Sequence, residues 1–251
     1  MYRYFTFVLL LIATTAMAQV GEYRNRFSVG ASGGYVMNSM GFQPSVLQKM
    51  HGGMTMGITG RYTSEKYFST LCAIQAEVNI TKTGWKQNNR TYYNTPVINP
   101  LTGVEEKYTR NITYVQIPFL AHLSWGRELK GFNFFINLGP QLGICIADKT
   151  SKNYDIPFTK DNFPEIYTSR EGRISNTVAQ ENMPVENKFD YGIAFGAGLE
   201  AHINHVGRFN IEGRYYYGLG NIYGDSKRDY FAKSNHGMIF IKLGYLYDLG
   251  K

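Results

Sequence analysis

Several glutamates lie in segments where apolar residues alternate with small or polar ones. These glutamates are the first candidates for catalysis, because carboxylates act as general acids and bases. Glu200, for example, lies in "FDYGIAFGAGLEAHI" at 189–203, where apolar residues alternate without a break with small or polar ones. A period of two predicts a β-strand with two unlike faces. Basic residues share the polar faces with the acids, so the expected chemistry is ion pairing inside a β structure rather than catalysis. The predicted interior polar network consists of Arg61, Glu77, Asp190, Glu200, Glu212, Arg214 and Lys242.

Two further patterns have the spacing of ligand sites. His202 and His205 are three residues apart, but a metal site needs a third ligand on the same side, and none is evident in the sequence. "GAGLEA" at 196–201 matches the dinucleotide-binding fingerprint with alanine in the last place. That fingerprint requires a helix after the glycines, whereas strand alternation continues to residue 203. The sequence therefore predicts no catalytic residue, no metal ion and no cofactor.

The alternating pattern recurs in eight segments bounded by turn residues. We expect strands at 27–38, 54–63, 67–85, 108–125, 132–147, 188–204, 208–220 and 237–249. The connections between them are alternately long and short, which is typical of a transmembrane barrel with tight periplasmic turns and long outer loops. Pro118 and Pro140 argue against two of these strands, because proline removes a donor from the hydrogen-bond ladder. Bulges or strand ends would accommodate both prolines.

The bulk of the apolar faces indicates which side of the sheet is inside. An eight-stranded barrel encloses only enough space for side chains to fill it. The Phe, Tyr, Leu and Ile side chains of the last three segments would not fit there, so the apolar faces must point outward into lipid. We therefore expect an all-β, eight-stranded antiparallel up-and-down transmembrane β-barrel. Aromatic residues near the segment ends are predicted to lie at the membrane interface: Tyr62, Tyr67, Trp85, Tyr108, Trp125, Phe132, Phe209, Tyr245 and Tyr247.

Export is predicted by the first residues of the chain. Arg3, an apolar run and the sequence Ala16-Met17-Ala18 are typical of a secretory signal peptide at 1–18, which leaves 19–251 as a single barrel domain. The formal net charge of +7 favours phosphate-bearing lipid head groups as partners over nucleic acid, because the basic residues do not form one stripe. The two cysteines, Cys72 and Cys145, fall on opposite faces of strands that are not neighbours, so no disulfide is expected.

Five stretches resemble the PorT-like outer-membrane β-barrel family of Bacteroidetes. They are "AIQAEVNITKTGW" (73–85), "YVQIPFLAHL" (114–123), "INLGPQLG" (136–143), "FDYGIAFGAGLE" (189–200) and "IEGRYYYGLGNIY" (211–223). The resemblance implies an outer-membrane location, an eight-stranded barrel and, for one branch of the family, a part in type IX protein secretion.

The function expected from these features is that of a non-enzymatic structural or docking component of the outer membrane. Its expected partners are membrane lipid and lipopolysaccharide, together with other envelope or secretion proteins that would contact the loops at 86–107 and 148–187. A lipid A-modifying enzyme and a small pore are the alternatives. The sequence leaves open the specific partner and the oligomeric state.

Overall fold

The computed structural model describes residues 21–88, 93, 95–98, 103–127, 130–153, 183–203, 206–224 and 231–249. The predicted signal peptide, most of the 148–187 loop and His205 lie outside these ranges. The strands are β1 (Glu22–Gln43), β2 (His51–Tyr67), β3 (Thr70–Asn88), β4 (Lys107–Gly126), β5 (Gly131–Lys152), β6 (Phe189–Ile203), β7 (Gly207–Gly218) and β8 (Lys233–Asp248).

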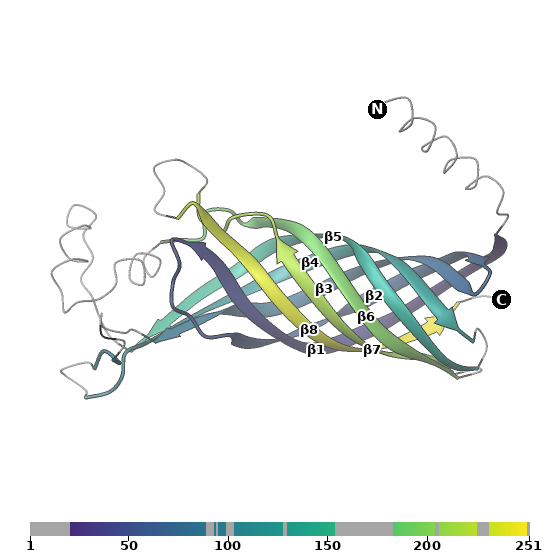
Figure 1. The fold of residues 1–251 in the computed structure, drawn as a ribbon, viewed down its shortest axis with the longest axis horizontal. Coiled ribbons are helices and arrows are strands. Elements are labelled where there is room, and N and C mark those ends of the chain that lie inside the picture. The colour runs from purple at the N-terminus through teal and green to yellow at the C-terminus, as the bar shows by residue number, and fades with distance from the viewer. Residues whose placement is uncertain are drawn as a thin grey trace, which may run out of the picture.

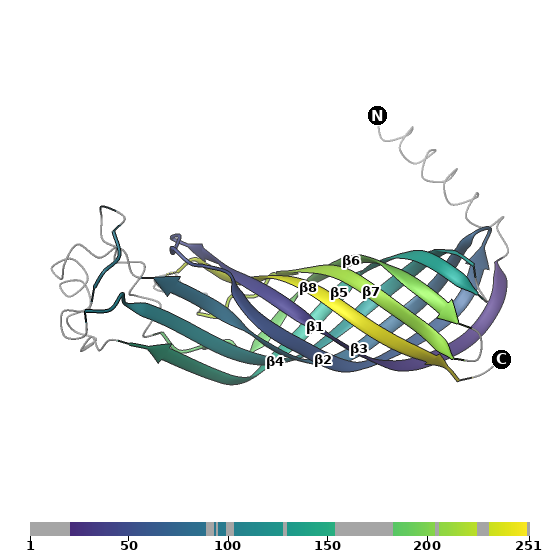
Figure 2. The ribbon, with the colours of Figure 1, turned by 90° about the horizontal axis from the view of Figure 1, so that it is seen from below.

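The eight strands form one closed antiparallel barrel in sequence order (Figure 1), which confirms the predicted fold class. Closure comes from β1 and β8, which pair continuously from Ser28 opposite Asp248 to Gln43 opposite Lys233. Closing the ring leaves no unpaired edge strand, as a sheet surrounded by lipid requires. The short turns lie at the end of the barrel where β1 begins and β8 ends, and the long connections lie at the opposite end (Figure 2).

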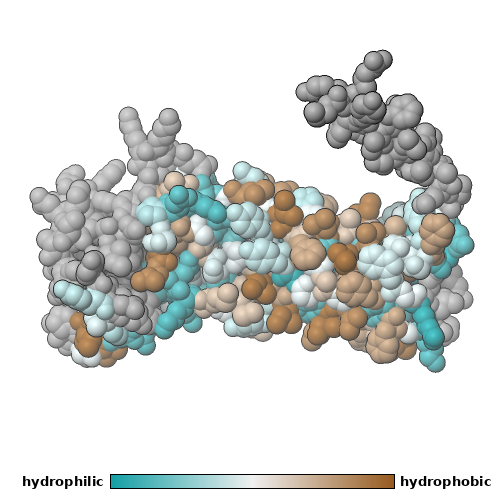
Figure 3. Space-filling model, in the orientation of Figure 1, coloured by the Kyte–Doolittle hydropathy of each residue, from teal (hydrophilic) through white to brown (hydrophobic). Residues whose placement is uncertain are grey.

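The outer surface of the barrel is apolar, as predicted. Phe195 and Leu199 of β6 are each 53% exposed, and Ile211, Ile241 and Leu243 point outward from β7 and β8. Apolar side chains cover much of the barrel wall, with polar side chains nearer its two ends (Figure 3). Such a surface is stable only in contact with hydrocarbon. No helix in the described part of the chain is long and apolar enough to cross a membrane.

Several strands are longer than predicted, mainly at the long-loop end. β1 extends to Gln43 rather than residue 38, and β5 extends to Lys152 rather than 147. Apolar alternation ends where the outer surface becomes polar, but backbone pairing continues beyond that point. The prediction followed the hydrophobic pattern, and the pattern marks the apolar belt rather than the whole strand.

Both prolines lie inside continuous strands. Pro118 of β4 is opposite Gln141 of β5, and Pro140 of β5 is opposite Ile193 of β6. The described pairing of β4 is interrupted beside Pro118 on both sides, between Ala76 and Asn79 of β3 and between Gln141 and Leu138 of β5. A local break in the ladder therefore accommodates proline without ending the strand.

The two cysteines lie on opposite faces of the barrel wall, as expected. Cys72 on β3 lies on the outward face, and Cys145 on β5 is buried on the inward face. Both are free thiols. β4 separates their strands in the ring, so the side chains cannot meet without unfolding the wall.

Candidate functional site

The lumen is filled by buried side chains that link strands on opposite sides of the ring. Glu77 of β3 accepts two hydrogen bonds from Arg214 of β7, at 2.6 and 3.0 Å. The ammonium group of Lys242 on β8 lies 2.6 Å from the same carboxylate. All three side chains are almost fully buried. The geometry places one carboxylate between two cations near the barrel axis.

Glu212 completes this group from the same strand as Arg214. Its carboxylate lies 2.8 Å from Nε of Arg214 and accepts a hydrogen bond of 3.0 Å from Asn137 of β5. Asn137 also contacts Nδ1 of His122 at 2.8 Å. The polar contacts therefore reach from one side of the lumen to the other, and the buried charges are compensated as a stable interior requires.

We call the contact of Glu77 with Arg214 and Lys242 the first strut, meaning a set of ion pairs that crosses the lumen. A second strut lies nearer the short-turn end. Arg61 of β2 contacts Glu200 of β6 at 2.5 Å, and both side chains are 1% exposed. Arg208 lies 3.4 Å from the same carboxylate. Gln75 joins this strut to the first, because it accepts a hydrogen bond from Arg61 at 2.9 Å and donates one to Glu77 at 2.7 Å. Six of the seven residues proposed for an interior network are thus connected to one another.

Asp190 is the member of the proposed network that lies apart. It is buried in the half of the barrel nearer the long loops, where Tyr216 donates a hydrogen bond of 2.8 Å to its carboxylate. Close to Asp190 in space, Tyr114 of β4 and His236 of β8 meet across the lumen at 3.0 Å. The alternation of residue types along 189–203 correctly predicted that Asp190 faces the lumen. Alternation does not indicate which residue on another strand Asp190 contacts.

A layer of aromatic side chains fills the lumen at the long-loop end, and the sequence analysis missed it. Phe42 packs against Trp85 at a centroid distance of 5.5 Å and against Phe231 at 5.2 Å. Tyr223 stacks on Phe231 at 5.7 Å. Phe42 and Phe231 are nearly fully buried. The inward faces were expected to carry mainly small and polar residues, and at this end of the barrel that expectation is wrong.

Trp85 and Tyr108 are therefore not membrane-interface residues, in contrast to the prediction. Trp85 is 0% exposed and Tyr108 is 1% exposed. Their position near a strand end suggested the interface. The alternation that places Glu77 inside, continued through Thr81 and Thr83, also turns Trp85 inward, and this signal could have corrected the prediction.

The other proposed interface aromatics lie on the outer wall near the short-turn end. Phe209 and Tyr245 contact each other across neighbouring strands at 5.0 Å, and Trp125 stacks on Phe134 at 6.0 Å. Outward aromatics at one level of a barrel are typical of the girdle at lipid head groups. The residues of this group are at least partly exposed: Tyr62, Tyr67, Trp125, Phe132, Phe209, Tyr245 and Tyr247.

Arg110 anchors the aromatic layer. Its guanidinium lies 5.4 Å from the centre of the Trp85 ring and makes a bidentate contact with Asp148 of β5 at 2.5 and 2.8 Å. It also donates to the hydroxyl of Tyr223 at 3.2 Å. Burial raises the pKa of the Tyr223 phenol above its ordinary value, so this hydroxyl stays protonated.

A register shift makes the contact between Arg110 and Asp148 possible. Tyr114 is opposite Cys145, but Thr113 is opposite Ala147, so Ile146 is an extra residue in β5. Without this bulge, strict alternation from the outward-facing Ile146 would turn Asp148 outward. The bulge reverses the parity and turns Asp148 into the lumen.

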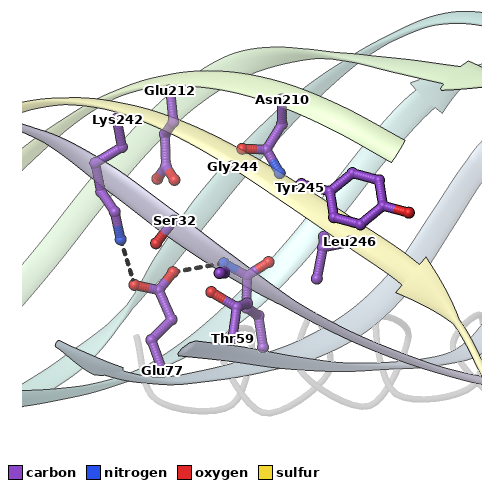
Figure 4. Close-up of a pocket in the computed structure, with 11 residues that line it drawn as sticks. Ser32, Thr59, Glu77, Asn210, Glu212, Lys242, Gly244, Tyr245 and Leu246 are labelled. Carbon is purple, nitrogen blue, oxygen red and sulfur yellow. Dashed lines mark hydrogen bonds and ion pairs between the residues drawn. The ribbon is translucent and has the colours of Figure 1, made fainter. Parts of the chain in front are cut away.

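The remaining space near the glutamates is too small for a substrate. One void lies beside Glu77, Lys242, Ser32 and Asn210, and it has room for about one water molecule. Lys242 reaches Glu77 at its edge (Figure 4). Acid–base catalysis requires a carboxylate within reach of a bound substrate. These carboxylates instead contact arginine or lysine, which suits a structural role.

The two ligand-like motifs are accounted for differently. "GAGLEA" lies inside the continuous strand β6, so no helix follows its glycines. A Cβ atom on Gly198 would lie 2.5 Å from the buried ring of Phe135, which explains the glycine as space for an inward aromatic side chain. His205 lies outside the described residues. Among those that the structure describes, no three His, Cys, Asp or Glu side chains are grouped as a metal site.

Comparison with known proteins gives one family match. The family model described as "Outer membrane protein beta-barrel domain" matches residues 17–224. No curated protein matches the chain.

Three solved structures illustrate the similarity. Ail, the attachment invasion locus protein of Yersinia pestis, in complex with the heparin analogue sucrose octasulfate, is 14% identical, with 89% of this chain and 100% of that chain covered and a TM-score of 0.39. OprG from Pseudomonas aeruginosa is 12% identical, with 90% and 98% covered and a TM-score of 0.38. Neisserial surface protein A is 12% identical, with 87% and 96% covered and a TM-score of 0.36.

Proposed function

Because the chain belongs to the outer membrane protein beta-barrel domain family, we propose that it acts in the outer membrane as a closed structural or docking component. One observation carries this proposal. The lumen is crossed by the buried contact of Glu77 with Arg214 and is filled by aromatic side chains at the long-loop end. A filled small barrel has neither a channel for solutes nor a pocket for a substrate.

The long-loop end is the part that we assign to docking. The long connections all emerge there, and binding residues commonly lie on loops held by a rigid scaffold. The struts and the aromatic layer below would hold that scaffold rigid. Lipopolysaccharide and other envelope proteins are the proposed partners, since both are present at an outer-membrane surface.

Participation in type IX protein secretion is the most specific version of this proposal. It is supported by the resemblance of five stretches to PorT-like barrels and by nothing else in the molecule. Comparing the proteins exported by cells with and without the gene tests it. An unchanged set of exported proteins would remove this version and leave the barrel proposal intact.

Export through a cleaved signal peptide also remains a proposal, supported by the composition of residues 1–18. N-terminal sequencing of protein purified from outer membranes should begin at Gln19. Recovery of a chain that retains Met1 would contradict it.

Single-channel recording tests the closed barrel most directly. The full protein in a planar lipid bilayer should give no steady conductance, because the struts and aromatic layer occupy the lumen. A steady conductance would favour a small pore. The second alternative, a lipid A-modifying enzyme, predicts a change in lipid A mass when the gene is deleted, whereas a docking component predicts none.

A further inference from the structure

The outer wall of β3, β4 and β5 changes from apolar to polar and basic over a few neighbouring rows toward the long loops. Ile80, Val115 and Ile144 are direct neighbours across these strands and form the last row that is apolar on all three strands; the bulge residue Ile146 is the one large apolar side chain of β5 beyond it. In the next row toward the long loops, Lys82 is opposite Thr113, and Thr113 is opposite Ala147. Hydrocarbon must end where an outward lysine first appears, because a charged side chain within it is costly. The rows above Ile80 therefore lie at the level of the lipid head groups.

Four exposed lysines lie on this wall and a fifth, Lys49, lies beside it in the connection between β1 and β2; we call the five the lysine wall. Its members are Lys49, Lys82, Lys86, Lys107 and Lys149. No acidic residue lies on the outward face of β3, β4 or β5 above the last apolar row. Of the nearest described acids, Asp148 pairs with Arg110, Glu106 is buried, and Glu105 is partly exposed just before β4 begins. No described acid forms an ion pair with these five lysines.

Lys49 and Lys86 are the closest pair in the lysine wall. They form an isolated antiparallel bridge, with the backbone N–H of Lys49 donating to the carbonyl of Lys86 at 2.7 Å. Directly opposite residues place their Cβ atoms about 5 Å apart, and like charges in this arrangement repel. An anion with several acceptor oxygens that contacts both ammonium groups would remove that repulsion.

We propose that the lysine wall binds the phosphate groups of a phosphate-bearing glycolipid in the outer leaflet. A phosphate monoester carries a charge near −2 and three acceptor oxygens, so one phosphate can contact two lysines. The acyl chains of the same molecule would lie against the apolar rows below. This inference rests on the outer-membrane location, and it does not depend on the docking role proposed for the loops.

Native mass spectrometry of the full protein in detergent, titrated with diphosphoryl lipid A or with the same lipid after dephosphorylation, tests the proposal. The wild type should retain the phosphorylated lipid preferentially, and less of it as salt is raised. The triple variant Lys82→Gln/Lys86→Gln/Lys149→Gln should bind on the order of 100-fold more weakly, since each lysine near an anionic lipid surface contributes about fivefold.

Two variants serve as controls. Lys66→Gln/Arg127→Gln/Lys130→Gln removes the same charge at the short-turn end and should bind like the wild type. Replacing Lys82, Lys86 and Lys149 by arginine keeps the charge and should keep most of the affinity. This variant distinguishes a loss of binding caused by the missing charge from one caused by misfolding. Equal binding of dephosphorylated lipid, an unaffected glutamine variant, or an equal loss in the short-turn control would each overturn the proposal. A steady conductance in the bilayer experiment would overturn the closed-barrel function without touching this result.

Discussion

Arg214 and Glu77 meet in a bidentate contact although their strands, β7 and β3, lie on opposite sides of the ring. Arg61 and Glu200 repeat the relationship between β2 and β6. Contacts across the lumen tie together strands that share no backbone hydrogen bond. The barrel is therefore a filled, cross-braced cylinder.

Removing the shared carboxylate should destabilise the barrel severely. Glu77→Gln leaves Lys242 buried without a contacting counter-charge and leaves Arg214 with Glu212 alone. Breaking a buried ion pair in this way costs about 3–5 kcal/mol. Urea unfolding in lipid vesicles, followed by tryptophan fluorescence, measures the change in the free energy of unfolding.

The matched control for Glu77 is Glu22→Gln. The Glu22 side chain is 70% exposed and contacts Arg24 at the short-turn rim. An exposed pair contributes about 0–1 kcal/mol, so this variant should unfold nearly as the wild type does. Similar losses in both variants would contradict a special role for the buried strut.

The second strut should show strong coupling in a double-mutant cycle. Arg61→Met and Glu200→Leu each leave the other charge buried without its partner across the lumen. The double variant removes both charges and should recover part of the lost stability, because an apolar pair of similar volume replaces a desolvated ion pair. Unfolding free energies that simply add would show that the two residues do not act as a pair.

Charge on the outer wall should be costly in proportion to depth. Phe195 lies midway along the apolar face of β6, so Phe195→Arg should destabilise the barrel in vesicles by about 2–4 kcal/mol. Tyr247→Arg, at the short-turn rim, should cost about 0–1 kcal/mol. Equal costs would mean that Phe195 does not face the centre of the bilayer.

The two tryptophans should report opposite sides of the wall. Trp85 is buried in the lumen, whereas Trp125 lies on the outer wall beside Phe134. In single-tryptophan proteins made by Trp125→Phe or Trp85→Phe, brominated lipid should quench Trp125 and leave Trp85 nearly unchanged. Quenching of Trp85 would restore the interface position that the sequence suggested.

The sequence by itself determined the fold. Strict alternation in segments such as 189–203, together with connections of alternating length, is compatible with few architectures. The volume of the apolar faces shows that those faces cannot point into the lumen. It also placed Glu77, Glu200 and Arg214 on the inner face, because the side-chain period of a strand is two.

Only the tertiary structure decided which inner residues meet. Side chains that meet across the lumen come from strands far apart in sequence. Alternation along one strand does not indicate which residue of a distant strand lies at the same height in the barrel. The bulge at Ile146, which turns Asp148 toward Arg110, is invisible to a strict period. The positions at which β1 and β5 end could not be predicted either. Beyond the apolar belt a strand continues through backbone hydrogen bonds, which leave no pattern of side-chain types in the sequence.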